Sequence, residues 1–241
     1  MNLYFLVEGF TESGFYPKFL EFYFDNAFKR VDFACDAKEN NYYLLNSGGC
    51  DFLYTGSQIP KDDDACLKNA IKEINENPVF DYLIICIDAD EFSIEERKDE
   101  FDKYIKKYTK ENISLSKSCT FQLVIQNRCL ETWFLGNEKM FKQNPANEPY
   151  ISYVKYYNVK QGDPEKMGNY SDKFTHQDFH LQYLRKMLSE KKQIYKKETP
   201  DTILNVKYLN ELEKRSTKKN KHLQTFAQFV TFCKEIKQKL T

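Results

Sequence analysis

The chain has 241 residues, with 36 Lys and Arg balancing 36 Asp and Glu, so its formal net charge at pH 7 is zero. This length suits one large α/β domain with or without a small appendage, and no apolar run reaches the ~20 residues of a membrane-spanning helix. The start lacks the basic region and cleavage site of a signal peptide. The seven cysteines are scattered and form no cluster with the three histidines, which leaves few ligands for zinc and favours reduced thiols in the cytoplasm.

The N-terminal segment predicts a strand that ends in an acid. Residues 2–7 form a short apolar run, Glu8 follows it, and Gly9 permits a sharp turn. Thr11 is the expected cap of the next helix, and Glu12 lies in its first turn. Glu8 and Glu12 therefore flank one strand-to-helix turn and can point at a common spot. Glu12 also suits a helix N-terminus, whereas a carboxylate that ends a buried strand needs a partner.

The middle of the chain alternates predicted strands and helices. Three aspartates at positions 62–64 precede a helical pattern, and we interpret them as an N-terminal cap rather than a metal cluster. Alternation of this kind predicts an α/β fold with a mostly parallel sheet. The expected strands are residues 30–35, 42–45, 80–87 and 120–125, and the expected helices are residues 65–74 and 93–108.

The stretch of residues 82–91 has the sequence Tyr-Leu-Ile-Ile-Cys-Ile-Asp-Ala-Asp-Glu, in which the apolar run of the predicted strand ends abruptly in acids. A continuous apolar run with β-branched residues is typical of a strand buried on both faces of a parallel sheet. Asp88 and Asp90 are two residues apart, which predicts side chains on the same side. Two close carboxylates favour a divalent cation between them. The alternative is a turn before a helix that Ser93 caps.

Residues 126–135 predict a short helix after a strand, with the single Trp133 anchoring it in the core. Glu131 lies among apolar residues, where an unpaired acid is costly. It is either a metal ligand or the partner of Arg128 at i−3. Farther along, His176 and His180 are four apart on a helix predicted for residues 175–190, and we interpret both as surface or substrate-facing residues.

Charge is unevenly distributed along the chain. Residues 1–120 hold 14 basic and 23 acidic side chains, whereas residues 121–241 hold 22 and 13. An acidic half joined to a basic half suits an enzyme that acts on a polyanion, although lysine-rich helix faces are often merely solvated. The most concentrated basic loop precedes a last helix predicted for residues 222–240. Its candidate phosphate contacts are Lys214, Arg215, Lys218, Lys219 and Lys221.

Three motifs in this order resemble the TOPRIM domain: Leu-Val-Glu-Gly-Phe-Thr-Glu at 6–12, Ile-Asp-Ala-Asp at 87–90 and Cys-Leu-Glu-Thr-Trp-Phe-Leu at 129–135. The likeness is to stand-alone TOPRIM-like proteins of bacteria and phages and to the nuclease half of the overcoming-lysogenization-defect (OLD) family. The resemblance implies a Rossmann-like catalytic core over residues 1–136, with a mainly helical basic region over 137–241. It also implies that Glu8, Glu12, Asp88 and Asp90 bind Mg²⁺ or Mn²⁺ and that Glu131 supplies a further catalytic acid.

The expected activity is metal-dependent cleavage of phosphodiester bonds in DNA or RNA. The chain lacks the Gly-x-x-x-x-Gly-Lys-Ser/Thr loop of an ATPase, and the resemblance suggests a separate ATPase partner in an anti-phage defence system. One alternative is a non-catalytic binding or regulatory protein on the same scaffold. Another is a nucleotide-sugar glycosyltransferase, in which Asp-Ala-Asp would bind a metal-diphosphate donor, but this reading leaves Glu8 and Glu12 unexplained.

Overall fold

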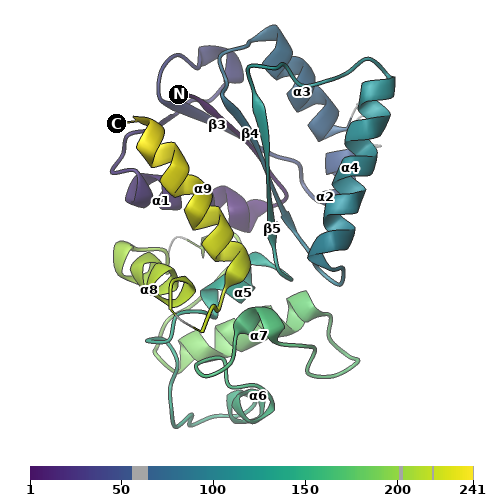
Figure 1. Ribbon diagram of the computed structural model, residues 1–241. Helices are drawn as coiled ribbons and strands as arrows, with labels where there is room; N and C mark the ends of the chain where they lie inside the picture. The colour runs from purple at the N-terminus through teal and green to yellow at the C-terminus, as the bar shows by residue number, and fades with distance from the viewer. Residues whose placement is uncertain (56–64, 201–202, 219, 241) are drawn as a thin grey trace. The chain divides into compact units, whose positions relative to one another are not determined.

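The computed structural model describes residues 1–55, 65–200, 203–218 and 220–240 (Figure 1). The chain forms two compact units. Unit 1 comprises Met1–Ile87 and Ile94–Ile125, and unit 2 comprises Asp88–Ser93 and Gln126–Thr241. The boundary predicted after residue 136 therefore lies within unit 2, and a short segment at the end of the central strand also belongs to that unit.

The strands confirm the predicted parallel α/β fold. Over the described residues they form a sheet of five parallel strands in the order β2-β3-β1-β4-β5. The central strand β1 is buried along its whole length, and its last residue, Val7, lies opposite Asn46 on one side and Cys86 on the other. The strands are β1 Leu3–Val7, β2 Lys29–Arg30, β3 Asn41–Asn46, β4 Tyr82–Asp88 and β5 Thr120–Gln126.

Helices cover both faces of the sheet in unit 1. Right-handed crossovers place the helix between β1 and β3 on one face and the helices that lead to β4 and β5 on the other. Figure 1 shows this arrangement, with α1 on the opposite side of the strands from α3 and α4. The helices are α1 Phe10–Tyr23, α2 Cys50–Thr55, α3 Cys66–Glu76 and α4 Ile94–Lys110, with a 3₁₀ turn at Ala34–Asp36.

Two details of unit 1 differ from the prediction. Helix α1 begins at Phe10 with Gly9 as its N-cap, because the Ser13 amide already donates to the Gly9 carbonyl at 3.1 Å. Thr11 is therefore buried inside the first turn and is not the cap. The strand predicted at residues 30–35 shortens to β2, and the chain turns into the 3₁₀ helix instead.

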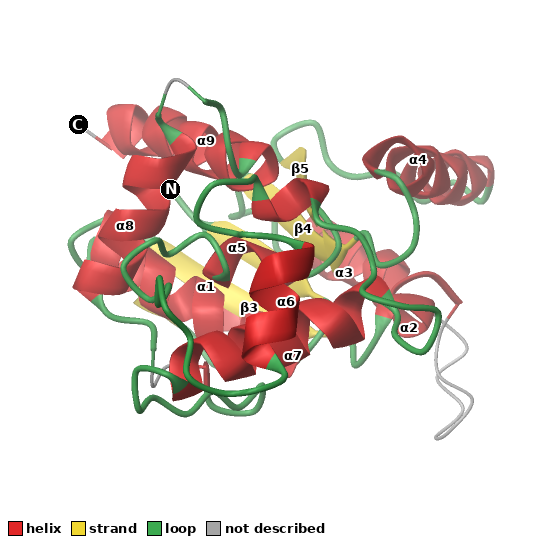
Figure 2. Cartoon of the chain, turned by 90° about the horizontal axis from the view of Figure 1, so that it is seen from below, coloured by secondary structure: helices red, strands yellow, loops and turns green. Residues whose placement is uncertain are grey.

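Unit 2 consists mainly of helices and loops, and the strands drawn in yellow in Figure 2 belong to unit 1 apart from their last residues Asp88 and Gln126. Trp133 anchors this unit as predicted: its indole N–H donates to Thr225 Oγ1 at 2.8 Å, and its ring contacts Phe226 and Phe229. The helices are α5 Leu130–Phe134, α6 Tyr150–Tyr156, α7 His176–Ser189, α8 Val206–Ser216 and α9 Gln224–Leu240, with a 3₁₀ turn at Pro164–Lys166.

Helix α8 is not predicted from the sequence, and its C-terminal end overlaps the basic loop expected at residues 214–221. Its last turn contains Lys214, Arg215 and Ser216. The other long helices of this unit end within two residues of their predicted limits. Across the described ranges, no helix is both long enough and apolar enough to span a bilayer.

Candidate functional site

The carboxyl edge of the sheet contains a topological switch point. Strands β1 and β4 are parallel neighbours, but the helix after β1 and the helix after β4 cover opposite faces. Open α/β sheets bind ligands outside the carboxyl ends of two such strands. Glu8 follows β1 directly, and Asp88 is the last residue of β4. Two of the predicted acids therefore lie at the carboxyl ends of the two strands that define the switch point.

Glu8 and Glu12 share the turn between β1 and α1 in unit 1. The Glu8 amide donates to the Cys86 carbonyl at 3.2 Å, which extends the β1–β4 pairing by one residue. The Glu12 side chain is 5 % exposed, and a Cβ added to Gly9 would lie 3.0 Å from its Oε2. The missing side chain of Gly9 therefore leaves room for the Glu12 carboxylate against the turn.

The Glu12 carboxylate also lies close enough to β4 to affect a thiol there. Burial raises the pKa of Cys86, and the negative charge of Glu12 adds to this increase. Cys86 is two residues before Asp88 on the same strand. Glu12 thus contributes negative potential near the end of β4, as well as to its own helix.

Asp88 and Asp90 differ in conformation although they are only two residues apart. Asp88 is buried and accepts a hydrogen bond from Gln177 Nε2 at 3.3 Å. Asp90 lies beyond the strand in the left-handed region, with φ of 52°. The predicted alternation along a strand therefore does not apply to Asp90, because β4 ends at Asp88.

The left-handed turn at Asp90 is held by a second left-handed residue, Arg128, with φ of 71°. The Asp90 amide donates to the Arg128 carbonyl at 2.8 Å, and Arg128 Nη1 donates back to the Asp90 carbonyl at 3.0 Å. Arg128 also reaches the Phe92 carbonyl at 3.3 Å. Such conformations cost about 1–3 kcal/mol each and concentrate at functional sites.

The first turn of α7 binds Glu91, an acid in the loop that follows β4. The His176 amide donates to Glu91 Oε1 at 2.6 Å, and His176 Nδ1 lies 2.5 Å from Glu91 Oε2. Burial raises the pKa of Glu91, but these bonds outweigh that effect and lower the pKa overall. The N-terminus of a helix favours a carboxylate for the same electrostatic reason. His176 therefore fixes the loop that follows β4.

His180 is a core residue, which corrects the prediction of a surface or substrate-facing role. Its side chain is fully buried, with Nδ1 2.7 Å from Thr132 Oγ1 and Nε2 3.1 Å from the Met167 carbonyl. Since a carbonyl only accepts, Nε2 carries the proton and Nδ1 accepts from the Thr132 hydroxyl. Burial lowers the pKa of His180 to about 3, so the ring is neutral.

Glu131 has partners other than the one predicted. Its side chain is 1 % exposed, its Oε1 accepts a hydrogen bond from the Tyr195 hydroxyl at 2.8 Å, and Lys197 Nζ lies 3.8 Å away. Arg128, the alternative partner predicted at i−3, instead reaches the carbonyls of the loop after β4. These contacts give Glu131 a structural role inside unit 2, whereas its catalytic role stays a prediction.

Arg215 cannot contact a phosphate as predicted, because it is 1 % exposed. Its guanidinium donates to three carbonyls, those of Gly136 at 3.1 Å, Val159 at 2.5 Å and Gly162 at 2.7 Å. It also lies beside His222 Nδ1. Burial lowers the pKa of the guanidinium, although Glu138 and Asp163 oppose this effect. Arg215 is therefore a structural residue that links three backbone carbonyls in the core of unit 2.

The lysines of the predicted basic loop are less free than expected. Lys214 pairs with Glu211 at 3.0 Å, and Lys218 pairs with Glu138 at 2.6 Å. Lys221 is exposed, while Lys219 lies outside the described residues, as do the three aspartates at positions 62–64.

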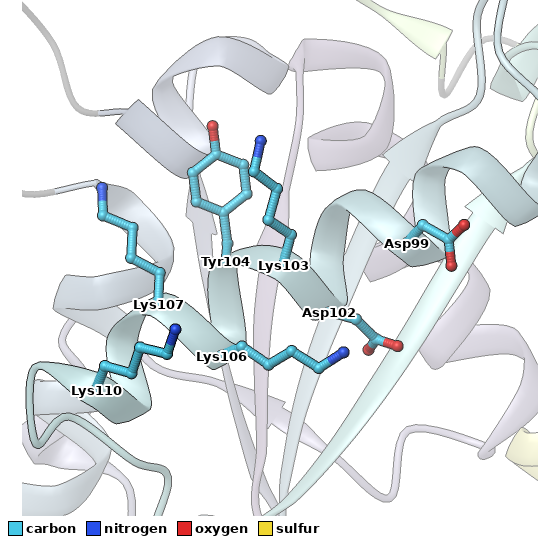
Figure 3. Close-up of a pocket in the computed structure, with 7 residues that line it drawn as sticks. All are labelled: Asp99, Asp102, Lys103, Tyr104, Lys106, Lys107 and Lys110. Carbon is cyan, nitrogen blue, oxygen red and sulfur yellow. The ribbon is translucent and has the colours of Figure 1, made fainter.

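A second basic surface, which the sequence analysis missed, lies on α4. Lys103, Lys106, Lys107 and Lys110 form what we call the α4 lysine row, at helical spacing of three or four residues. Figure 3 shows them with Tyr104, Asp99 and Asp102 around a hollow in the surface. None of the four forms an ion pair with another described residue. Lysines near a helix C-terminus also stabilise the helix, so the row has a structural explanation as well.

The acids do not form a ready-made metal cage. Within the described part of the chain, no group of three or more His, Cys, Asp or Glu side chains is arranged to hold a metal ion. The donor chemistry nevertheless suits Mg²⁺, which binds carboxylate oxygens and keeps several waters. Such an ion would also offset the mutual repulsion of neighbouring carboxylates.

Comparison with known protein families matches residues 7–204 to a family described as a domain of unknown function, DUF4276. No curated protein and no solved structure matches the chain. The matched range includes Glu8, Glu12, Asp88, Asp90 and Glu131, draws on both units, and ends before the basic segment at residues 214–221. More than half of the chain is covered, and the protein therefore belongs to the DUF4276 family.

Proposed function

We propose that this protein is a divalent-metal-dependent nuclease in which Glu8, Glu12, Asp88 and Asp90 hold Mg²⁺ or Mn²⁺. The observation that carries the proposal is the position of Glu8 and Asp88 at the carboxyl ends of two neighbouring parallel strands whose connections leave on opposite faces. The order of the three motifs, which resembles TOPRIM proteins, points the same way. A partner ATPase and a role in anti-phage defence are part of the proposal and rest on the resemblance alone.

A bound metal would polarise the scissile phosphate and lower the pKa of a bound water. The chain's own residues prepare the loops for this task. Gly9 leaves space for the Glu12 carboxylate, and the Gln177 amide orients Asp88 without changing its charge. The bonds between Asp90 and Arg128 fix the turn that follows β4. Each loop is thus held by contacts within its own unit.

The α4 lysine row supplies positive charge for a phosphate backbone. Helix α4 begins at Ile94, soon after β4 ends, and rises about 1.5 Å per residue. Lys103 and Lys110 therefore lie about 14 and 24 Å along the helix from its start. A nucleic-acid strand bound along the α4 lysine row would extend for several nucleotides from the carboxyl edge of the sheet. Binding through such lysines weakens as salt concentration rises.

The decisive experiment is a cleavage assay with plasmid, single-stranded DNA and total tRNA, each with Mg²⁺, Mn²⁺ or a chelator. We expect metal-dependent cutting that Glu8→Gln and Asp88→Asn abolish without lowering Tm. Glu39→Gln is the matched control, because Glu39 is an exposed acid next to Lys38, whose carbonyl binds Asn2 at the opposite end of β1. Undiminished cutting by Glu8→Gln would remove the assignment.

A non-catalytic binding protein is the second candidate. It is favoured by the lack of an assembled metal cluster among the described residues and by the contacts that α7 makes with Asp88 and Glu91. A ligand that binds only the folded state raises Tm. This candidate predicts no cleavage and no change of Tm on adding Mg²⁺ or Mn²⁺. The nuclease predicts a rise in Tm that Glu8→Gln loses.

A further inference from the structure

An exposed phenylalanine accompanies the acid that follows β1. Phe10 is the first residue of α1, two residues after Glu8, and 75 % of its side chain is exposed. The buried residues of the helix begin with Thr11 and Glu12, so Phe10 takes no part in the core of unit 1. An apolar ring at this position contributes little to folding, because it stays in water.

The loop after β4 repeats this arrangement within unit 2. Phe92 lies two residues after Asp90 and is 50 % exposed. Its carbonyl accepts the hydrogen bond from Arg128 that also helps to fix the loop. An exposed aromatic side chain therefore lies two residues after an acid both at the start of α1 and in the loop after β4.

We propose that Phe10 stacks on an unpaired base, so that the substrate is a single-stranded or locally unpaired nucleic acid. This inference rests on the proposed nuclease function and names its substrate class. Every base offers a flat aromatic face, and stacking on a protein ring is tolerant of sequence. Bases inside a duplex are already stacked on each other and do not offer that face.

The chain supplies a matched control for Phe10. Phe33 is 67 % exposed and also belongs to unit 1. It precedes Ala34, whose carbonyl accepts a hydrogen bond from Asn77 just before β4 begins, so it lies toward the amino edge of the sheet. Phe33→Ala thus removes a ring of similar exposure far from the acids, and neither substitution removes a buried side chain.

The test measures binding of labelled single-stranded DNA, single-stranded RNA and duplex DNA in a chelator, where cleavage does not occur. Stacking on one ring is worth about 1–3 kcal/mol, so Phe10→Ala should weaken single-strand binding about 5- to 150-fold. Duplex binding should stay unchanged, and Phe33→Ala should behave like the unmodified protein. Phe10→Trp should retain affinity and show fluorescence quenching by a stacked base, with buried Trp133 as a constant background.

Equal single-strand affinity for Phe10→Ala and Phe33→Ala would overturn the inference, as would an equal loss for single strands and duplex. A protein that binds neither single strand would overturn it too. These results are separate from the cleavage assay. Phe10-dependent binding without metal-dependent cutting would refute the proposed nuclease activity and support the stacking contact. Metal-dependent cutting by a protein whose single-strand affinity does not depend on Phe10 would support the nuclease and refute the stacking contact.

Discussion

Two buried titratable side chains should make the stability of unit 2 depend on pH in opposite directions. Burial lowers the pKa of His180 to about 3, from 6.5 for an ordinary histidine. Burial raises the pKa of Glu165 from 4.5 to about 7, although hydrogen bonds from Thr225 oppose this increase. Both side chains are less than a tenth exposed, so solvent screens neither strongly.

The sign of each effect follows from which state binds the proton. Below pH 6.5 the unfolded chain protonates His180 while the folded chain does not, so stability is lost, by about 2 kcal/mol at pH 5. Between pH 4.5 and 7 the folded chain keeps a proton on Glu165 that the unfolded chain releases. Stability is therefore gained as pH falls, by about 2.5 kcal/mol at pH 5. The two contributions nearly cancel in the unmodified protein.

Urea unfolding at about pH 7.5 and pH 5 tests this balance. Glu165→Gln removes the gain, so it should lose about 2–3 kcal/mol more than the unmodified protein between the two pH values. His180→Asn should change in the opposite direction, by about 2 kcal/mol. Glu198→Gln, at an exposed acid of the same unit, should follow the unmodified protein. Identical pH dependence for Glu165→Gln and Glu198→Gln would refute the reasoning.

Four further predictions follow from the contacts. Arg215→Lys should lower the free energy of unfolding by about 3 kcal/mol, because an ammonium cannot reach three carbonyls at once. The nucleic-acid affinity of the folded protein should stay the same. A loss of affinity without a loss of stability would restore the phosphate-binding role of Arg215. Glu131→Ala should lower the free energy of unfolding in urea by about 3 kcal/mol, but the variant should keep the rise in Tm on adding Mg²⁺. Loss of that rise would show that Glu131 is a metal ligand. Lys192→Gly should raise the free energy of unfolding by about 1 kcal/mol in the same assay, because Lys192 has φ of 57° just after α7 and glycine adopts this left-handed conformation without steric cost. A lower free energy of unfolding would contradict this prediction. Reversing the charges of Lys103 and Lys107 together should weaken nucleic-acid binding and flatten its salt dependence, whereas an unchanged salt slope would show that the row is only solvated.

The sheet was predictable because its signals are local. The runs at Leu3–Val7 and Leu83–Ile87 are continuously apolar, which is typical of a short strand buried on both faces. The positions of Glu8 and Asp88 follow from those strand ends. Helix α8 was missed because its charged residues dominate the pattern, although Leu209 and Leu212 show helical spacing and are buried.

The partners of charged residues were not predictable, because they come from distant parts of the chain. Tyr195, which binds Glu131, is 64 residues away in sequence, whereas the predicted partner Arg128 is a near neighbour. The left-handed backbone at Arg128 directs its side chain to the Asp90 carbonyl instead. Arg215 likewise becomes a core residue only because α8 brings it to the Gly136 carbonyl. Local spacing contains none of this information.

The kinds of partner suggest which acids a cation can use. The Gln177 amide holds Asp88 but carries no charge of its own, so this contact orients the carboxylate without neutralising it. A Lys ammonium lies 3.8 Å from Glu131, and the Tyr195 hydroxyl occupies the same oxygen. A divalent ion at Glu131 would therefore have to compete with the Lys197 ammonium. The Gln177 amide that binds Asp88 brings no competing positive charge to that carboxylate.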